Sequence, residues 1–171
     1  MAFVLETPRL SLRQFRQADL EIFLAYRNDP LVARYQGWET PYPRETAQEF
    51  VTEMQAAIPG MPGVWLQLAV EQRETGVMLG DVAFHRLKTE PRQAYIGYTL
   101  ARAHWGHGYG REAVSRLLDY LFRDLGLHRV VADCDVENSA SIHLLEQLGF
   151  RREGHFIEKT WANGGGASDY L

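Results

Sequence analysis

The glycine-rich segment HWGHGYG at positions 104–110 constrains this chain more than any other stretch of its sequence. Glycine stands at positions 106, 108 and 110, and apolar side chains follow at helical spacing, at 114, 117, 118, 121 and 125. Because glycine tolerates backbone angles that other residues avoid and has no side chain, successive N–H groups can converge on a ligand. At the positive end of a helix dipole, this arrangement predicts a phosphate or pyrophosphate site.

Two other interpretations of this segment compete with the first. A glycine-rich turn that merely leads into a helix needs no ligand, because glycine motifs often match by chance. The spacing Gly108-x-Gly110-x-x-Ala113 also fits a dinucleotide-binding fingerprint, with Asp133 and Asp135 about where a ribose-binding carboxylate would stand. However, hairpins precede the segment, and too little chain follows it for two βαβαβ halves. A Walker loop is excluded because no Lys-Ser or Lys-Thr follows the last glycine.

Hydrophobic periodicity predicts one α/β (α+β) domain over residues 1–171. Strands are expected at 10–12, 64–70, 77–87, 95–100 and 129–135, with one or two more after residue 150, and helices at 19–26, 44–58, 111–125 and 139–148. Asp19 is expected to cap the first helix, and the glycines at 164–166 are expected to form a loop. Early hairpins followed by βαβ units predict a mixed sheet.

The charge balance and the cysteine count limit the environment and partners of the chain. With 22 acidic against 18 basic side chains, the formal net charge is −4, and without basic runs no nucleic-acid partner is expected. The single cysteine, Cys134, excludes an intrachain disulfide. The N-terminus lacks the pattern of a secretory signal, and no apolar run is long enough to span a membrane. A cytoplasmic protein without a membrane partner is therefore expected.

Further motifs occur in order along the chain and, together with the glycine segment, resemble a known protein family. The pattern R/Q-x-x-G-x-G/A aligns on Trp105-x-x-Gly108-x-Gly110, with tryptophan in place of Arg or Gln. The accompanying motifs are TPRLSLR at 7–13, IGY at 96–98, EA at 112–113, Asn138-x-x-Ser141 and LLEQLGF at 144–150. Together they resemble the GCN5-related N-acetyltransferases (GNAT), and the W-G-x-G-Y run resembles their ribosomal-protein N-terminal acetyltransferase (RimJ/RimL-like) branch. The resemblance implies the GNAT fold, a mixed, twisted central sheet flanked by helices.

The resemblance implies direct transfer of an acetyl group from acetyl-CoA, as cosubstrate, to a primary amine. It also implies the residues that bind CoA, namely Tyr98, Thr99, Leu100, Trp105, Gly106, His107, Gly108, Tyr109, Gly110, Arg111, Asn138 and Ser141. Three acceptor classes stay open, because fold does not select among them: a protein N-terminal amine, an aminoglycoside-like antibiotic, and a small amine or amino acid. Two other functions also stay open, a CoA-binding sensor or structural module without turnover and an NAD(P)-binding reductase.

At the leaving-group end, the resemblance points to Asn138 and Ser141 as catalytic candidates. Asn138 is also a good N-cap for the helix expected at 139–148, and Ser141 would then lie in the first turn of that helix. Many relatives carry a tyrosine as general acid later on this helix, where this chain has Leu145. Ser141 is therefore the candidate that would serve the departing thiolate.

The candidates near the nucleophile lie on the strand expected at 77–87, because this chain has Tyr95 where relatives often carry a glutamate. Asp81 is the candidate for a catalytic base, and His85 is a candidate for binding the substrate. Since they stand four positions apart in a strand, both side chains are expected on one face of the sheet. The alternative interpretations are an edge or turn carboxylate and a plain surface histidine. An amine that arrives partly neutral would need no strong base.

The link between the first two helices carries Tyr35, Trp38 and Glu39, and in this family that link borders the acceptor site. Two aromatic rings and a carboxylate suit an ammonium group through cation–π and charge attraction, although loop packing explains each residue equally well. His104-x-x-His107 has no third ligand nearby, so no metal is expected. A homodimer is one option, because such domains often pair through their late strands.

Overall fold

The computed structural model describes residues 3–162 and 165–170. Its strands are β1 (Val4–Glu6), β2 (Leu10–Arg13), β3 (Trp65–Gln72), β4 (Met78–Arg86), β5 (Gln93–Leu100), β6 (Arg129–Val131), β7 (Cys134–Asp135), β8 (His155–Ala162) and β9 (Gly165–Tyr170). Its α-helices are α1 (Leu20–Arg27), α2 (Pro30–Ala33), α3 (Arg44–Ala56), α4 (Tyr109–Asp119) and α5 (Ser139–Gln147). Short 3-10 segments, Gln17–Asp19 and Arg102–His104, precede α1 and α4, and a π-helical turn, Tyr120–Asp124, ends α4.

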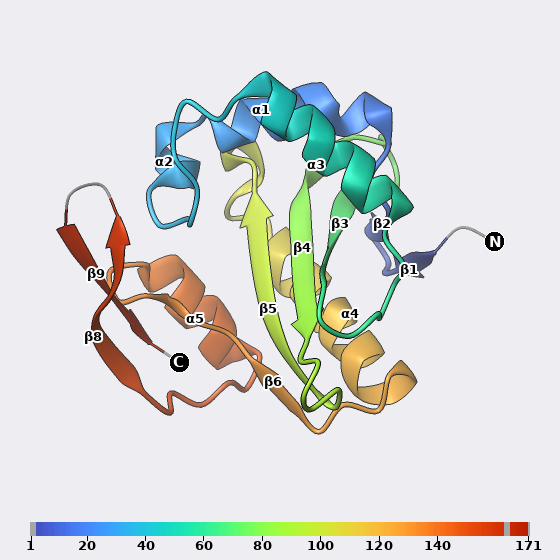
Figure 1. The fold of residues 1–171 in the computed structure, drawn as a ribbon. Coiled ribbons are helices and arrows are strands. Elements are labelled where there is room, and N and C mark those ends of the chain that lie inside the picture. The colour runs from blue at the N-terminus through green and yellow to red at the C-terminus, as the bar shows by residue number, and fades with distance from the viewer. Residues whose placement is uncertain (1–2, 163–164, 171) are drawn as a thin grey trace.

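Six strands form the central sheet in the order β1-β2-β3-β4-β5-β6 (Figure 1). All neighbouring pairs are antiparallel except β5 and β6, which run parallel. A parallel pair needs a connection that crosses over the sheet, and α4 provides it. The expectation of a mixed sheet is confirmed.

β5 and β6 stay paired over a short distance, from Gln93 opposite Arg129 to Tyr95 opposite Val131. The chain then leaves the central sheet, and β7 pairs with β9 in a second, three-stranded sheet of order β7-β9-β8. The prediction of one strand over residues 129–135 is therefore wrong, because the last two of these residues pair with β9 in the C-terminal hairpin. In the part of the chain that the structure describes, no strand flanks β5 beyond Tyr95 on the β6 side.

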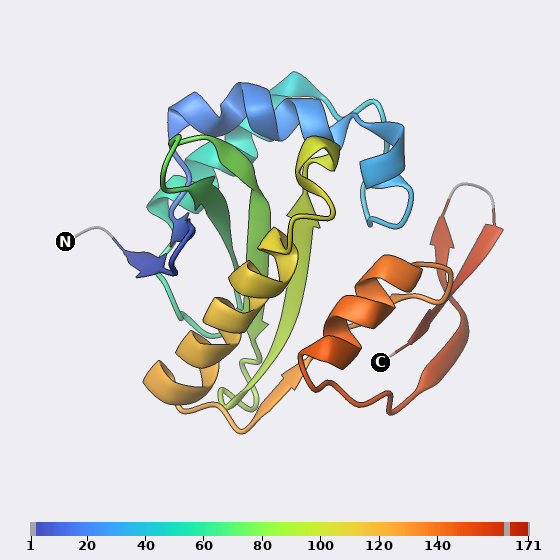
Figure 2. The same ribbon diagram turned by 180° about the vertical axis from the view of Figure 1, so that it is seen from behind.

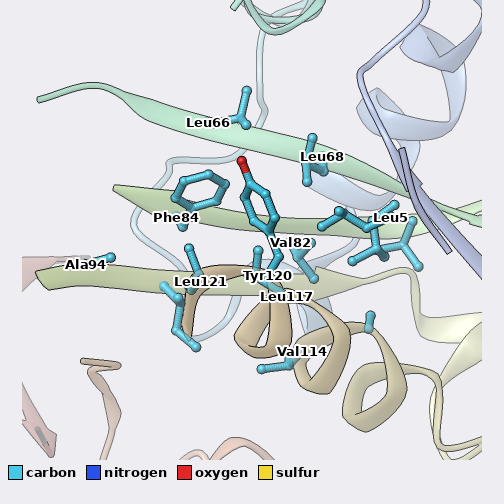
Figure 3. Close-up of a cluster of buried hydrophobic side chains, with 14 of the residues drawn as sticks. Leu5, Leu66, Leu68, Val82, Phe84, Ala94, Val114, Leu117, Tyr120 and Leu121 are labelled. Carbon is cyan, nitrogen blue, oxygen red and sulfur yellow. The ribbon is translucent and has the colours of Figure 1, made fainter. Parts of the chain in front are cut away.

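Helices cover both faces of the central sheet, with α1 and α3 on one face and α4 on the other (Figures 1 and 2). On the α4 face, strand residues pack against the apolar stripe of the helix (Figure 3): Leu66, Leu68, Val82 and Phe84 meet Val114, Leu117 and Leu121. On the other face, a second core contains Phe15, Phe23, Val51 and Met54. Burial of these side chains stabilises the domain by about 25 cal/mol per Å² of apolar surface removed from water. The stripe predicted from helical spacing therefore faces the core.

Two short elements, β1 and α2, were not expected from the sequence. Asn28-Asp29-Pro30 ends α1, and the same residues also start a new turn of helix. The Asp29 side chain accepts a hydrogen bond from the Leu31 N–H at 2.9 Å, and Pro30 occupies the first helical position, where its missing N–H costs nothing. This short helix, α2, lies above α5 in Figure 1.

Two local expectations are corrected by tertiary contacts. Asp19 occupies the N-cap position of α1, but its side chain makes no capping hydrogen bond, because its carboxylate accepts the Arg16 N–H and binds the guanidinium of Arg13 at 2.7 and 2.8 Å. Gly165 and Gly166 belong to β9 rather than to a loop, and Gly164 lies outside the described residues.

Candidate functional site

A cleft of about 550 Å³ opens where β5 and the β6–β7 segment diverge. Its walls come from the second half of β5, the glycine turn, the first turn of α4, one face of α5, and α2 with the residues after it. Most of the site residues expected from the sequence line it: Tyr35, Tyr98, Thr99, Leu100, Trp105, Gly106, Gly108, Tyr109, Gly110, Arg111, Asn138 and Ser141. The other candidates lie outside this lining: Trp38, Glu39, Asp81, His85 and His107.

The glycine turn presents backbone N–H groups to this cleft. Gly106 and Gly108 have φ angles of 77° and 76°, a left-handed conformation that residues with side chains rarely adopt, and Gly108 is the N-cap of α4. The first hydrogen bond of the helix runs from the Glu112 N–H to the Gly108 carbonyl at 3.1 Å, so the N–H groups of residues 109–111 precede it. At the positive end of an 11-residue helix, these groups suit an anion.

The space around the glycines shows whether a diphosphate would fit there. A Cβ at Gly106 would meet no protein atom within 4 Å, and one at Gly108 would meet Arg9 Nη2 at 3.5 Å. A Cβ at Gly110 would lie 3.0 Å from Leu144 Cδ1 on α5. The first two glycines therefore keep space open beside the N–H groups, and the third lets α5 pack closely against α4. The residues present fit a diphosphate.

Residues from the N-terminal segment hold the turn in place. The Glu112 carboxylate accepts hydrogen bonds from the Thr7 hydroxyl and the Arg9 N–H, and it pairs with Arg9 Nε at 2.6 Å. Arg9 Nη1 also donates to the His107 carbonyl at 3.0 Å, and its guanidinium lies 4.6 Å from the centre of the Tyr109 ring. Burial acts to raise the pKa of Glu112, but the hydrogen bonds from Thr7 and Arg9 outweigh it and hold that pKa below its usual value.

Trp105, which departs from the family pattern, joins the turn to the end of β5. Its indole Nε1–H donates to the Leu100 carbonyl at 2.8 Å, while 45% of the residue stays exposed. The Leu100 carbonyl is therefore occupied by the protein itself. Trp105 anchors the turn with its nitrogen and lines the cleft with its ring.

Two hydroxyl groups meet inside the cleft. Tyr98 on β5 and Ser141 in the first turn of α5 place their hydroxyl oxygens 2.6 Å apart. Asn138 Oδ1 accepts the Ser141 N–H at 3.1 Å, which confirms the predicted N-cap of α5. Burial raises the pKa of Tyr98 to about 12, so its phenol stays protonated at neutral pH.

Asp81 lies deep under α1 and not in the cleft. Its side chain is 1% exposed and accepts hydrogen bonds from the Tyr26 hydroxyl and from Gln67 Nε2, the latter at 2.9 Å. Arg27 Nη2 lies 3.9 Å from the same carboxylate. Asp81, the candidate for a catalytic base, therefore does not line the cleft, because neighbours from α1 and β3 occupy both of its oxygens.

His85 shares a face of β4 with Asp81, as expected, because the register with β3 and β5 is unbroken between the two residues. Its ring lies beside that of Trp65, with the ring centres 5.4 Å apart. Neither β4 candidate therefore reaches the cleft.

Arginines of the chain itself cover the two aromatic rings considered for an acceptor. The guanidinium of Arg27 lies 3.7 Å from the centre of the Trp38 ring, and that of Arg34 lies 5.0 Å from the Tyr35 ring. Trp38 Nε1–H also donates to the Arg27 carbonyl at 2.9 Å. Glu39 is exposed outside the cleft lining. Tyr35 is thus the member of this group that lies at the cleft.

A sequence model of the acetyltransferase (GNAT) domain matches residues 9–151. The chain belongs to the GNAT acetyltransferase family. An uncharacterized N-acetyltransferase of Bacillus subtilis (strain 168), YoaA, is 36% identical over 162 residues, which cover 94% of this chain and 90% of the relative. The predicted family is confirmed, and the chain is an acetyltransferase rather than an NAD(P)-binding reductase.

Solved structures share the fold of this acetyltransferase. Spermidine N-acetyltransferase from Vibrio cholerae, solved in complex with CoA and spermine, has a TM-score of 0.82 at 26% identity, over 96% of this chain and 94% of that one. The ribosomal-protein-S5-alanine acetyltransferase from Vibrio fischeri has a TM-score of 0.82 at 21% identity, over 98% and 93%. The second likeness, at 21% identity, shows the fold alone.

Several cleft residues of this acetyltransferase were not expected from the sequence. Arg34, after α2, pairs with Glu137, before α5, at 3.8 Å, and both line the cleft. One face of α5 also contributes Ala140, His143, Leu144 and Gln147. The helical spacing of this face was a signal in the sequence, whereas the Arg34–Glu137 pair depends on how α2 and α5 approach each other.

Among residues 3–162 and 165–170, no group of three His, Cys, Asp or Glu side chains is placed to hold a metal. His104 lines the cleft, and burial together with the nearby His107 lowers its pKa. Within the same described residues, no helix is long and apolar enough to cross a membrane.

Proposed function

We propose that this acetyltransferase uses acetyl-CoA and transfers the acetyl group directly to a primary amine. The observation that carries the proposal is the glycine turn: the N–H groups of residues 109–111 open onto a cleft in which Gly106 and Gly108 leave space beside them. This arrangement suits a diphosphate, which is part of CoA. We further propose that residues 1–171 act as one domain in the cytoplasm. The homodimer stays a prediction.

The side of β5 that faces the cleft suits the extended arm of CoA. Since β6 diverges after Tyr95, the described chain offers no strand partner there to the backbone of Tyr98 and Thr99. An extended ligand can use the backbone groups that a missing neighbour leaves open. An N–H group of β5 would also donate a hydrogen bond to the thioester oxygen, where negative charge develops during transfer.

Ser141 is the proposed hydrogen-bond donor at the leaving group. Transfer breaks a carbon–sulfur bond and forms a carbon–nitrogen bond, so the sulfur gains one proton and the amine nitrogen loses one. Ser141 lines the cleft at the start of α5, where Asn138 fixes its backbone. A positioned donor at the departing sulfur lowers the barrier to its release. The buried position of Asp81 favours an amine that reaches the cleft partly neutral over one deprotonated by that carboxylate.

The acceptor is proposed to be a primary amine, either of a protein N-terminus or of a small molecule. Tyr35 is the acceptor candidate that lines the cleft. The formal net charge of −4 favours a cationic partner, because the diphosphate can be bound by backbone N–H groups without a basic surface.

Release of free thiol from acetyl-CoA tests the proposal with a panel of N-terminal peptides, aminoglycosides, polyamines and amino acids. We expect amine-dependent thiol release and a rise in Tm with CoA, since a ligand at 100 times its Kd adds about 2.7 kcal/mol of stability. NAD(P) serves as the control ligand and is expected to leave Tm unchanged. A protein that is stabilised by CoA but releases no thiol with any amine would contradict the proposal.

A further inference from the structure

The hydroxyl groups of Tyr98 and Ser141 come from separate elements and meet in the cleft. Their oxygens are 2.6 Å apart, whereas the Tyr98 hydroxyl lies 3.4 Å from the Ser141 carbonyl oxygen. The shorter contact has the distance of a good O–H···O hydrogen bond. The two residues stand 43 positions apart, so the pair is a product of the packing of α5 beside β5.

The backbone of Ser141 is held firmly, but its hydroxyl proton needs a separate constraint. The Ser141 N–H donates to Asn138 Oδ1 at 3.1 Å, and α5 packs against the start of α4 where Leu144 meets Gly110. A serine hydroxyl can still rotate about its Cβ–Oγ bond, so these contacts give its proton no direction. The hydrogen bond with Tyr98 can give that proton a direction.

We propose that Tyr98 is a positioning residue for Ser141: the Tyr98 hydroxyl donates to Ser141 Oγ, which leaves the Ser141 proton directed into the cleft toward the departing sulfur. This inference rests on the proposed function, in which Ser141 is the donor at the leaving group. It gives the side chain of Tyr98 a role in addition to the backbone contacts proposed for β5.

The surroundings of Tyr98 leave its phenol able to donate this hydrogen bond. Burial raises the pKa of the phenol to about 12, although the hydrogen bond with Ser141 acts to lower it. The phenol therefore keeps its proton across the neutral range and remains a donor. It is a weaker acid than a thiol, whose pKa is about 8.5, so Tyr98 does not protonate the sulfur itself.

The step balances without a charged serine or tyrosine. As the carbon–sulfur bond breaks, the sulfur keeps the electron pair, and Ser141 stabilises the growing charge by a hydrogen bond. The proton that the sulfur finally gains is matched by the proton that the amine nitrogen loses when the carbon–nitrogen bond forms. Tyr98 keeps its proton throughout.

A double-mutant cycle of Tyr98→Phe and Ser141→Ala in the full-length chain tests the inference. The change S141A is expected to lower kcat about 10²-fold, the lower end of the range for a hydrogen-bond donor aimed at charge that develops in the transition state. The change Y98F is expected to lower kcat about tenfold, which corresponds to one hydrogen bond. The double variant is expected to be as slow as S141A, because Tyr98 acts through Ser141. KM for acetyl-CoA is expected to stay at the wild-type value throughout.

Tyr120→Phe is the matched control. Burial also raises the pKa of Tyr120, but this residue lies in the core beside α4 and outside the cleft lining, so Y120F is expected to retain the wild-type kcat. The inference is overturned by a Y98F variant with wild-type kcat, or by one that changes KM alone. It is also overturned if Y98F lowers kcat equally with and without the Ser141 hydroxyl, because Tyr98 would then act independently.

Failure of the inference differs from failure of the proposed function. If the proposed function fails, the wild-type protein releases no thiol with any amine, whereas failure of the inference leaves wild-type turnover intact. If thermal unfolding shows that Y98F does not fold, the inference is tested with the S141A variant alone. An unchanged kcat in S141A then overturns the inference, because there is no donor for Tyr98 to position, whereas a loss of kcat at constant KM supports the donor that the inference requires.

Discussion

Arg9 and Glu112 stand 103 positions apart and form a 2.6 Å ion pair beside the glycine turn. Arg9 directly precedes β2, and Glu112 lies in the first turn of α4. Because Arg9 also donates to the His107 carbonyl, one side chain ties the N-terminal segment both to the helix and to the turn. Two separate sequence motifs, TPRLSLR and the glycine segment with its EA pair, are thus one structural unit.

Glu112→Gln is expected to lower the free energy of unfolding by about 1 kcal/mol at neutral pH, because its hydrogen bonds from Thr7 and Arg9 lose the carboxylate charge. Since the pKa of Glu112 is below its usual value, this stabilisation is present above the usual glutamate pKa and is lost as the pH falls through the folded value. Denaturant unfolding of both proteins, at neutral and at acid pH, checks this.

The matched control for this change is Asp119→Asn, farther along α4. It breaks an exposed pair with Arg123, at 3.5 Å, and is expected to change stability by less than about 0.5 kcal/mol. A stability difference for E112Q that stays constant down to acid pH would show that the charge of Glu112 is not the cause.

Gly106→Val and Gly76→Val form a second matched pair. Both glycines have positive φ, 77° and 70°, and a Cβ at either would meet no protein atom within 4 Å, but Gly106 lines the cleft whereas Gly76 lies in the β3–β4 turn. Backbone strain should cost each variant about 1–3 kcal/mol. KM for acetyl-CoA is expected to rise in G106V alone, by about tenfold or more, for the loss of one or more hydrogen bonds. Equal KM values in the two variants would speak against ligand binding at the turn.

Gly80→Ala is expected to destabilise the sheet strongly. Gly80 has a φ of 157°, and a Cβ there would lie 2.1 Å from the Thr99 carbonyl oxygen and 2.7 Å from Leu100 Cα. Both atoms belong to the backbone of β5 and cannot move aside, so a loss of about 3 kcal/mol or more is expected in denaturant unfolding. Gly37→Ala, with open space around its Cβ, is the control. Similar losses in the two variants would mean that the close approach at Gly80 is relaxed easily.

Asp81→Asn is expected to lower the free energy of unfolding by about 3 kcal/mol, because Arg27 would lose its buried carboxylate partner. The new amide would also accept fewer hydrogen bonds than the carboxylate that now takes those of Tyr26 and Gln67. Unfolding midpoints in denaturant measure the loss. A D81N protein that unfolds at the wild-type midpoint but no longer turns over would instead support the role of catalytic base.

Local sequence signals explain which parts of the site were predictable. The amphipathic helix, the glycine turn before it and the Asn138 cap are each specified by residues within a few positions of one another. In contrast, the strand expected at 129–135 follows its local pattern only as far as Val131. Its continuation is decided by pairing with β9, more than 30 residues further along the chain.

The sequence by itself determined the family, the mixed sheet and the backbone chemistry of the glycine turn, because periodicity and glycine spacing act over short distances. Tertiary structure alone decided that Asp81 is buried against Tyr26 rather than facing the cleft, and that Tyr98 meets Ser141. It also opened the cleft, by drawing the chain after Val131 away from β5. The physical reason is the same in each case: a side chain's burial and partners depend on residues from distant elements, whose approach no local pattern specifies.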